Sequence, residues 1–244
     1  MLLSFVVMLV WVSGVSANEN PQEVKLSEKD VFGKDVEEVI KEVKEGNSDL
    51  STFDRQLEEE AELKVEGENG ELEIPVQANT KELNTIQKNS GTKSYETTIV
   101  GEVSEAELAV TGSQEKEDSG QGASVVSRVN WTESNIGGIT HYSLDSASAE
   151  YTVSSGYSIS GEQMTYGQSG PTRASGYDCS AYCTQQNTIY YNEAIWYNID
   201  VHHDWAPVTD TFQAVTGVTV NATISDGSDS WNLSLFNHVF LNWG

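Results

Sequence analysis

His202, His203 and Asp204 form the densest group of potential metal ligands in the sequence. Adjacent residues of a strand point to opposite faces of the sheet, so His202 and Asp204 could share a face while His203 could not. A zinc site needs three or four ligands, and the others would have to come from distant histidines or acidic residues. A polar strand end before Pro207 explains the group more simply, so the sequence predicts no metal or other cofactor.

Residues 167–171 read Gly-Gln-Ser-Gly-Pro and superficially match the nucleophile turn of chymotrypsin-like proteases. Such a protease needs a base histidine and a buried carboxylate beside its serine. The only preceding histidine is His141, 28 residues before Ser169, and Gln168 stands where the turn would carry an acid. We therefore interpret the segment as a glycine-rich surface turn.

Paired carboxylates are another arrangement that could do chemistry, because two carboxyl groups at a set separation hydrolyse glycosides. Acids of the second half could supply such a pair between two sheets, for example Glu133, Glu150, Glu162 and Glu193. No spacing in the sequence selects one pair from this set. We therefore expect a protein that is not an enzyme and has no catalytic residues.

Cys179 and Cys183 are the two cysteines of the chain. In an exported protein a local disulfide is the expected state of such a pair, whereas two thiolates on a metal would need ligands that the sequence does not place. The bond would close a very small loop and stabilise the fold by on the order of 2 kcal/mol. We expect it to fix the shape of the loop at residues 176–184.

Aromatic residues are the strongest recognition signal. Those of the second half cannot all face one core if their strands alternate. Tyrosine and tryptophan combine apolar area with a polar tip, so exposed ones suit surfaces that recognise sugars, peptides or lipid interfaces. The alternative is that most of them pack in the core and on sheet faces. The candidate recognition aromatics are Tyr190, Tyr191, Trp196 and Tyr197.

These candidates all lie in the second half because the composition changes near Gly120. Residues 18–120 contain eleven of the thirteen Lys and Arg and 27 of the 38 Asp and Glu, whereas residues 121–244 contain nine of the ten Tyr. The formal net charge of the whole chain is −25. Such a chain gains nothing from counterion release, which argues against nucleic acid as a partner, and attraction to anionic lipid is disfavoured for the same reason.

The beginning of the chain predicts export. Residues 2–12 form an apolar run, and small residues follow it, so we expect a signal peptide that is cleaved between Ala17 and Asn18. The run is too short to cross a bilayer of roughly 30 Å as a helix. No basic residue precedes it, which departs from the usual pattern. We expect a secreted, extracellular mature form without a transmembrane segment.

Residues 18–93 predict an acidic, partly helical region. Apolar residues recur at helical spacing between Val31 and Val43, and a second amphipathic stretch begins at Ser51. Both stretches are poor in bulky apolar residues, so we expect them either to dock on the second half or to stay mobile. Residues 66–93 are typical of a linker with one short strand.

Strand patterns prevail after this region. Residues 215–224 alternate between apolar and polar side chains, and the same alternation resumes at Trp231 after the Asp-Gly-Ser-Asp turn at 226–229, which is typical of a hairpin. Many short strands without helical spacing between them favour a mainly β fold with an antiparallel, jelly-roll-like β-sandwich. The expected parts are a signal peptide at 1–17, an acidic helical or flexible pro-like region at 18–93 and a β-sandwich domain at 94–244.

Two segments of the second half carry a family resemblance. Ser154-Ser155-Gly156-Tyr157-Ser158-Ile159-Ser160-Gly161-Glu162 and Ser230-Trp231-Asn232-Leu233 resemble the geobacillin-type large secreted bacteriocins of Gram-positive bacteria. Those are unmodified antibacterial proteins, distinct from lanthionine peptides. The resemblance implies an antibacterial protein that is released into the medium and inhibits related bacteria, and it carries no catalytic residue across.

The leading hypothesis is therefore a secreted bacteriocin-like antibacterial protein whose acidic region serves as a leader or a mask. The alternative is a non-catalytic module that binds cell wall or carbohydrate, or mediates adhesion, through surface aromatics. An extracellular hydrolase is a third hypothesis, which would need converging carboxylates or a metal. The first two hypotheses share a partner class, a bacterial cell-envelope component or a carbohydrate.

Overall fold

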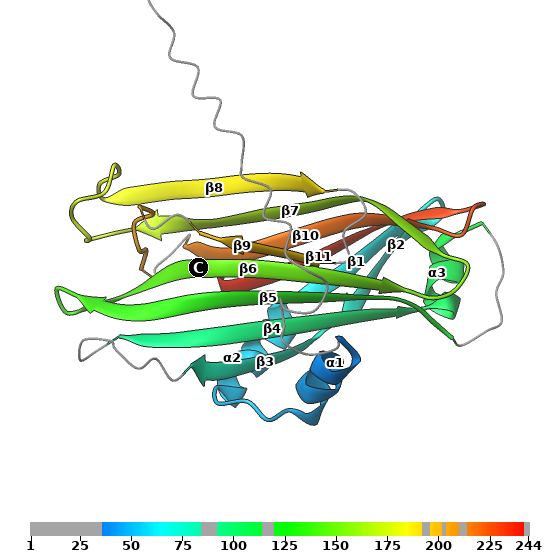
Figure 1. The fold of residues 1–244 in the computed structure, drawn as a ribbon, viewed down its shortest axis with the longest axis horizontal. Coiled ribbons are helices and arrows are strands. Elements are labelled where there is room, and N and C mark those ends of the chain that lie inside the picture. Colours follow the sequence, from blue (N-terminus) through cyan, green and yellow to red (C-terminus); the bar gives the residue numbers. More distant parts are fainter. Residues whose placement is uncertain are drawn as a thin grey trace, which may run out of the picture.

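The computed structural model describes residues 36–83, 92–113, 120–191, 196–201, 204–209 and 214–241. Within these ranges the chain is mainly β, as predicted, with two antiparallel sheets packed face to face as a sandwich (Figure 1). The expected signal peptide and its cleavage site between Ala17 and Asn18 lie outside the described residues.

The first sheet has six strands in the order β2-β1-β11-β10-β7-β8, and we call it the six-stranded sheet. Its strands, in chain order, are β1 (Glu62–Gly67), β2 (Gly70–Pro75), β7 (Ser158–Pro171), β8 (Tyr182–Tyr191), β10 (Val215–Ser225) and β11 (Ser230–Leu241). The second, five-stranded sheet has the order β3-β4-β5-β6-β9. Its strands are β3 (Gln77–Leu83), β4 (Lys93–Ser104), β5 (Gln121–Ile136), β6 (Ile139–Val153) and β9 (Trp196–Asp200).

The predicted hairpin joins β10 to β11, and its turn is held by the side chains of Ser225 and Asp226. Asp226 Oδ1 accepts hydrogen bonds from the backbone N–H of Ser228 at 3.0 Å and of Asp229 at 2.9 Å. Gly227 adopts a φ of +91°, a conformation that glycine takes without steric cost. The turn therefore sets the register in which Ser225 pairs with Ser230.

The core lies between the sheets because each strand alternates apolar and polar side chains. On β10 and β11 most inward residues are apolar and buried, while their neighbours face outward. Asn237 of β11 is a buried polar exception, and its Nδ2 donates to the Ser127 carbonyl of the opposite sheet at 3.1 Å. Trp131 of the opposite sheet stacks on Tyr95 with 4.3 Å between ring centroids. Its Nε1 donates to Thr97 Oγ1 at 2.9 Å, which satisfies the buried indole N–H. The inward residues of β10 and β11 include Val218, Val220, Ala222, Ile224, Trp231, Leu233, Leu235 and Val239.

Three helices lie beside the sheets within the described residues: α1 (Val36–Glu45), α2 (Ser51–Glu60) and α3 (Glu105–Thr111). The first amphipathic stretch docks on the five-stranded sheet through α1. The valines and the isoleucine of α1 pack on Val100 of β4 and Val126 of β5, in a small cluster separate from the main core. Helix α3 follows β4 and begins with a capping box, in which Glu107 N–H donates to Ser104 Oγ and Ser104 N–H donates to Glu107 Oε2.

The sandwich begins earlier than the boundary expected at residue 94. Strands β1, β2 and β3 lie in the region expected to be helical or flexible, and β1 is inserted between β2 and β11. Leu63 and Val65 are fully buried and pair with Leu235 and Leu233. Strands β1 and β2 each turn two apolar residues towards the core, with charged residues between them, and β3 turns only Ala78 there. The one strand expected within the linker at 66–93 is present as β2, but the linker itself is wrong for residues 66–83, because the end of β1 and all of β3 also lie in the sheets.

Candidate functional site

One row of cross-strand neighbours traverses the six-stranded sheet from edge to edge, and we call it the cross-strand row. Each member pairs with the next across adjacent antiparallel strands, so all of them point to one side of the sheet. Leu233 and Ala222, next to the row on their strands, face the core, so the row faces outward. With about 4.8 Å between strands, the row is about 24 Å long. From β8 to β2 it consists of Tyr190, Gln163, Asn221, Ser234, Lys64 and Glu73.

The middle of the row lies in an open groove of about 400 Å³. Its floor includes Gly161, which has a φ of +64° at the point where the register of β7 against β10 shifts. A bulge of this kind bends and twists the sheet locally. The groove is lined mainly by amide, hydroxyl and charged groups, among them Gln163, Asn221, Thr223, Asn232 and Ser234.

Hydrogen bonds within the groove orient its two asparagines. Ser234 Oγ donates to Asn221 Oδ1 at 2.7 Å, and Thr223 Oγ1 donates to Asn232 Oδ1 at 3.0 Å. Among the described residues, neither asparagine's Nδ2 nor the Gln163 amide has a protein partner. These amide groups therefore offer hydrogen bonds to a ligand that enters the groove.

Charged side chains gather at the β1–β2 end of the row. Lys64 Nζ lies 2.9 Å from Glu62, 3.4 Å from Glu71 and 3.2 Å from Glu73, measured to the carboxylate oxygens. The hydrogen bond to Glu62 is the largest cause that raises the pKa of Lys64 above its ordinary value. Because the glutamates surround the ammonium group, this end of the row carries excess negative charge.

The structure separates the four candidate aromatics. Tyr190 is 79% exposed and lies beside Gln163 in the cross-strand row. Tyr191 follows it on β8, whereas Trp196 and Tyr197 belong to β9, at an edge of the five-stranded sheet. The side chains of the last three lie outside the described residues. Sequence analysis identified Tyr190 but missed its partners Gln163, Asn221 and Ser234, because outward polar residues are ordinary on a sheet and their register could not be read.

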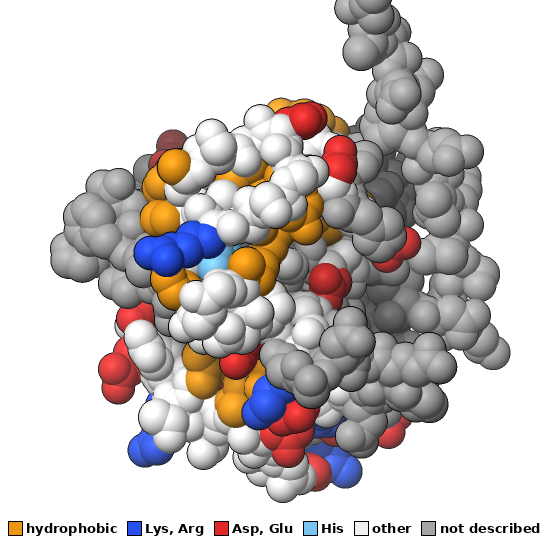
Figure 2. All heavy atoms as spheres, turned by 90° about the vertical axis from the view of Figure 1, so that its left-hand side faces the viewer, with side chains coloured by type: hydrophobic (Ala, Val, Ile, Leu, Met, Phe, Trp, Pro, Cys, Tyr) orange, Lys and Arg blue, Asp and Glu red, His pale blue; other side chains and the backbone are white. Residues whose placement is uncertain are grey.

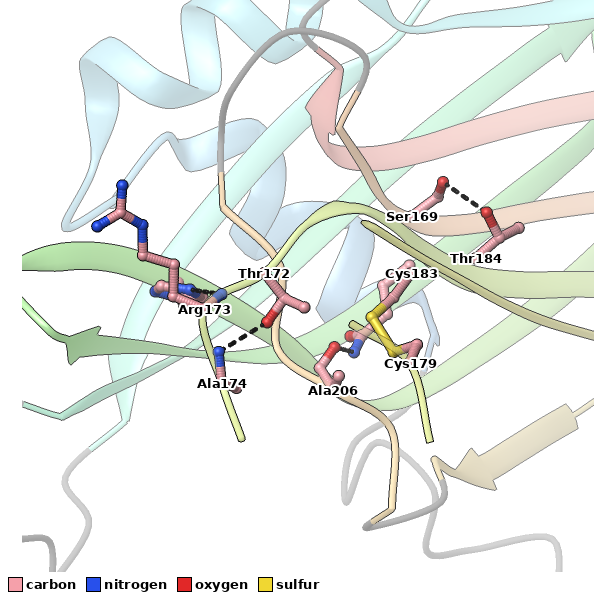
Figure 3. Close-up of a disulfide and its surroundings, with 10 residues drawn as sticks. Ser169, Thr172, Arg173, Ala174, Cys179, Cys183, Thr184 and Ala206 are labelled. Atoms are coloured by element: carbon pink, nitrogen blue, oxygen red, sulfur yellow. Dashed lines mark hydrogen bonds between the residues drawn. A yellow bond between two sulfur atoms is a disulfide. The ribbon is translucent and has the colours of Figure 1, made fainter. Parts of the chain in front are cut away.

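A disulfide connects the loop before β8 to the second residue of that strand. A disulfide joins Cys179 to Cys183, with 5.5 Å between their Cα atoms (Figure 3). Cys183 is buried against Ala206 and Val208. Between the cysteines, Ala181 has a φ of +69°, which is uncommon for a residue with a Cβ. The loop therefore has a defined shape, and its carbonyl at Ala181 accepts from Thr172 N–H at 3.0 Å.

The stapled loop belongs to the end of the sandwich at the left of Figure 1. Figure 2 shows this end, where apolar side chains lie between uncharged polar ones and the basic side chains form small, separate groups. Arg173 is exposed here, and its backbone N–H donates to His141 Nε2 at 3.0 Å. This end presents loops of mixed chemistry.

The segment at 167–171 is part of strand β7, so our interpretation of it as a surface turn is wrong. Gln168 is buried and joins three chain segments, since it accepts from Leu144 N–H at 2.7 Å and donates to the Ala206 carbonyl at 2.6 Å. Gly167 permits a close approach of β8, because a Cβ there would lie 2.8 Å from the Gln185 carbonyl oxygen. Both ring nitrogens of His141 contact backbone groups, so the histidine does not serve Ser169 as a base.

The remaining candidates do not form a site within the described residues. Glu150 pairs with Val126, which packs under α1 on the outer face of the five-stranded sheet, whereas Glu162 lies on the core side of β7 with Met164, so the two buried carboxyl groups do not face each other. His202 and His203 lie outside the described residues, and Asp204 is exposed. Within the described ranges, no group of three or more His, Cys, Asp or Glu could hold a metal ion. No helix within the same ranges is long and apolar enough to span a membrane.

Comparison with known proteins adds no relative: no family model, no curated protein and no solved structure matches this chain. The cross-strand row is thus a candidate site that rests on its geometry alone.

Proposed function

We propose that this protein binds a carbohydrate of the bacterial cell envelope, without catalysis, through the cross-strand row. The observation that carries the proposal is the alignment of an exposed aromatic ring with amide groups whose N–H donors have no protein partner among the described residues. Tyr190 offers an open ring, and Gln163 and Asn221 follow it on successive strands. Sugars present apolar ring faces that pack on aromatic rings, and hydroxyl groups that exchange hydrogen bonds with amides.

The shape of the site supports a chain-like ligand. The row is about 24 Å long and open along its length, so it can contact several sugar rings of one polymer. The groove at its centre gives one ring a more enclosed position between Gln163, Asn221 and Asn232. These groups bind and orient, and the proposal assigns them no part in bond cleavage.

Export belongs to the same proposal. The apolar run at residues 2–12 and the small residues before Asn18 support a signal peptide. The disulfide between Cys179 and Cys183 supports an oxidising location. A protein that is exported through the cell envelope comes into contact with the polysaccharides of the envelope, which are the proposed ligands of the row.

Retention on purified cell walls tests the proposal. The chain from Asn18 is incubated with insoluble walls of Gram-positive bacteria and with chitin, and the free fraction is measured over a concentration series. We expect saturable binding that falls at least tenfold in the double variant Gln163→Ala, Asn221→Ala. Thr184→Ala, an exposed change on β8 outside the groove, serves as the matched control. No retention on any glycan, or equal loss in the control, would refute the proposal.

A bacteriocin-like activity is the second candidate, and one observation favours it. The two segments that resemble geobacillin-type bacteriocins meet across β10, since Ser158 and Ser230 both pair with Ser225. Gly161 and Asn232, one from each segment, line the groove. Binding to the envelope at this groove would then be the first step of growth inhibition.

A growth-inhibition assay on Gram-positive lawns separates the two functions. The chain from Asn18 is compared with its Gln163→Ala, Asn221→Ala variant at equal concentration. Clearing that the variant loses supports an antibacterial role that begins at the groove. Binding to walls without clearing at any concentration leaves the carbohydrate-binding function and refutes the bacteriocin activity.

A further inference from the structure

The two sheets end in four edge strands, and three of them oppose pairing with another chain. On β3, the backbone N–H groups of Ala78, Thr80 and Glu82 donate to side chains of the α2 region, at 2.9, 3.1 and 2.8 Å. Their acceptors are Glu58, Asp54 and Asp49. The free edge of β3 is therefore already occupied by acidic side chains.

The edges β2 and β9 are protected in other ways. Strand β2 carries Glu71 and Glu73 and ends at Pro75, and charge and proline on an edge discourage further strand addition. Strand β9 has only five residues and ends at Asp200. A short, charged edge offers few backbone groups to a partner.

The fourth edge strand, β8, has none of these protections. Its ten residues, Tyr-Cys-Thr-Gln-Gln-Asn-Thr-Ile-Tyr-Tyr, include no charged residue and no proline. It lies along the upper border of the sandwich in Figure 1, at the end of the six-stranded sheet. A long, uncharged edge strand is a template for pairing with another strand.

The free backbone groups of β8 can be identified. Thr188 N–H donates to the side chain of Asn187 at 2.8 Å, and from this partner we infer that the backbone of Thr188 faces the open edge. Backbone direction alternates along an antiparallel strand, so Gln186 and Tyr190 face the same way. In the described part of the chain, no backbone hydrogen bond satisfies this edge at Gln186 or Tyr190.

The surroundings of β8 favour a second copy of this chain as the partner. Two copies that each carry a net charge of −25 repel one another over most of their surfaces. The outward side chains of β8, and those of β7 from Gln163 to Ser169, are uncharged, so repulsion is weakest at this edge. A two-fold axis places the same strand of two copies side by side and antiparallel, so the backbone donors of each copy meet the acceptors of the other.

We propose that two copies of this protein pair through β8, antiparallel and about a two-fold axis near Gln186 and Asn187. The two six-stranded sheets then form one continuous sheet, held by main-chain hydrogen bonds and by facing threonine and glutamine side chains. Because the axis is perpendicular to the sheet, both outer faces lie on the same side. The inference goes beyond the proposed binding function and does not depend on it.

Sedimentation velocity of the chain from Asn18, over about 1 to 100 µM, tests the proposal. We expect a concentration-dependent dimer. In the variant Gln186→Lys, two like charges face each other close to the axis, so the dimer dissociation constant should rise at least tenfold. Asn232→Lys adds the same charge on the same face but on β11, away from the edge, and should change the constant by less than twofold.

A second variant tests the backbone pairing itself. Gln186→Pro removes one N–H at the free edge while the pairing of β8 with β7 retains its N–H groups. It should abolish the dimer while the monomer keeps its β-sheet circular dichroism. A chain that stays monomeric at 100 µM overturns the proposal. A dimer that both Gln186 variants leave intact also overturns it, because the interface then lies elsewhere.

Discussion

At the scale of single residues, the position of a side chain on the sheet matters more than its type. Tyr190 and Tyr182 are both exposed tyrosines of β8, at 79% and 44%. Tyr190 lies in the cross-strand row next to Gln163, whereas Tyr182 lies at the stapled end of the strand beside Ser169, 3.3 Å from its hydroxyl. Only the first is placed to act together with the groove.

Replacement of Tyr190 therefore tests the aromatic part of the site. Tyr190→Ala should weaken binding to cell-wall glycan about fivefold, because an aromatic contact contributes about 1 kcal/mol beyond its buried area. The measurement is the dissociation constant from a retention isotherm. Tyr182→Ala is the control, with an unchanged constant, and equal weakening in both variants would show that the row is not the binding surface.

His238 makes the stability of the fold depend on pH. It lies on β11 with its Nε2 3.1 Å from Thr219 Oγ1, and burial lowers its pKa to about 4. In the unfolded chain its pKa is about 6.5. Between these values the unfolded state binds more protons, so the folded state loses stability as the pH falls from 6.5 to 4, by up to about 3 kcal/mol.

The prediction is measured as a difference between the original chain and His238→Gln, by urea unfolding at pH 7.5 and pH 4.5. The original chain should lose more unfolding free energy between the two values than the variant does, because glutamine has no proton to bind. Equal losses in the two chains would contradict a lowered pKa for His238.

At the scale of elements, the connections follow local rules that can be tested one at a time. Helix α3 starts at a capping box made by Ser104 and Glu107, and Trp231 Nε1 donates to the Leu108 carbonyl of the same helix at 3.0 Å. Helix α2 begins at Ser51 without a side-chain cap. Both serines lie at the start of a helix, but only Ser104 should contribute to the free energy of unfolding as a cap.

Ser104→Ala should lower the free energy of unfolding by about 1 kcal/mol, because the orphan N–H of Glu107 loses its acceptor. Ser51→Ala is the matched control and should change the free energy by less than about 0.5 kcal/mol. Chemical denaturation with tryptophan fluorescence measures both. A loss of the same size at Ser51 would show that capping is not the cause.

At the scale of the whole molecule, the acidic first part of the chain is built into the sandwich. Strand β1 lies between β2 and β11, and β3 pairs with β4 along its whole length. A mask that can be removed after export would therefore have to end before Glu62, so that β1 remains in its sheet. Helix α1 meets this condition, since Gly46, with a φ of +66°, ends it before the first strand.

Two truncations distinguish a removable segment from a structural one. The chain from Asn47 should keep its β-sheet circular dichroism and cooperative thermal unfolding, with a lowered midpoint because Val100 and Val126 lose their cover. The chain from residue 94 lacks β1 to β3, which bury Leu63, Val65 and Ile74, and should fail to unfold cooperatively. Cooperative unfolding of this shorter chain would show that the first three strands are dispensable.

The sequence by itself determined the features that depend on near neighbours. The β10–β11 hairpin, the antiparallel β-sandwich and the local pairing of Cys179 with Cys183 all follow from alternation, turn residues or short spacing. Only the tertiary structure decided the assignment of β1 to β3, because one or two inward apolar residues per strand make too weak a pattern. It also decided the cross-strand row, which joins Lys64, Gln163 and Ser234. A period of two tells which face a residue occupies, but which residues become neighbours on that face depends on strand order and register.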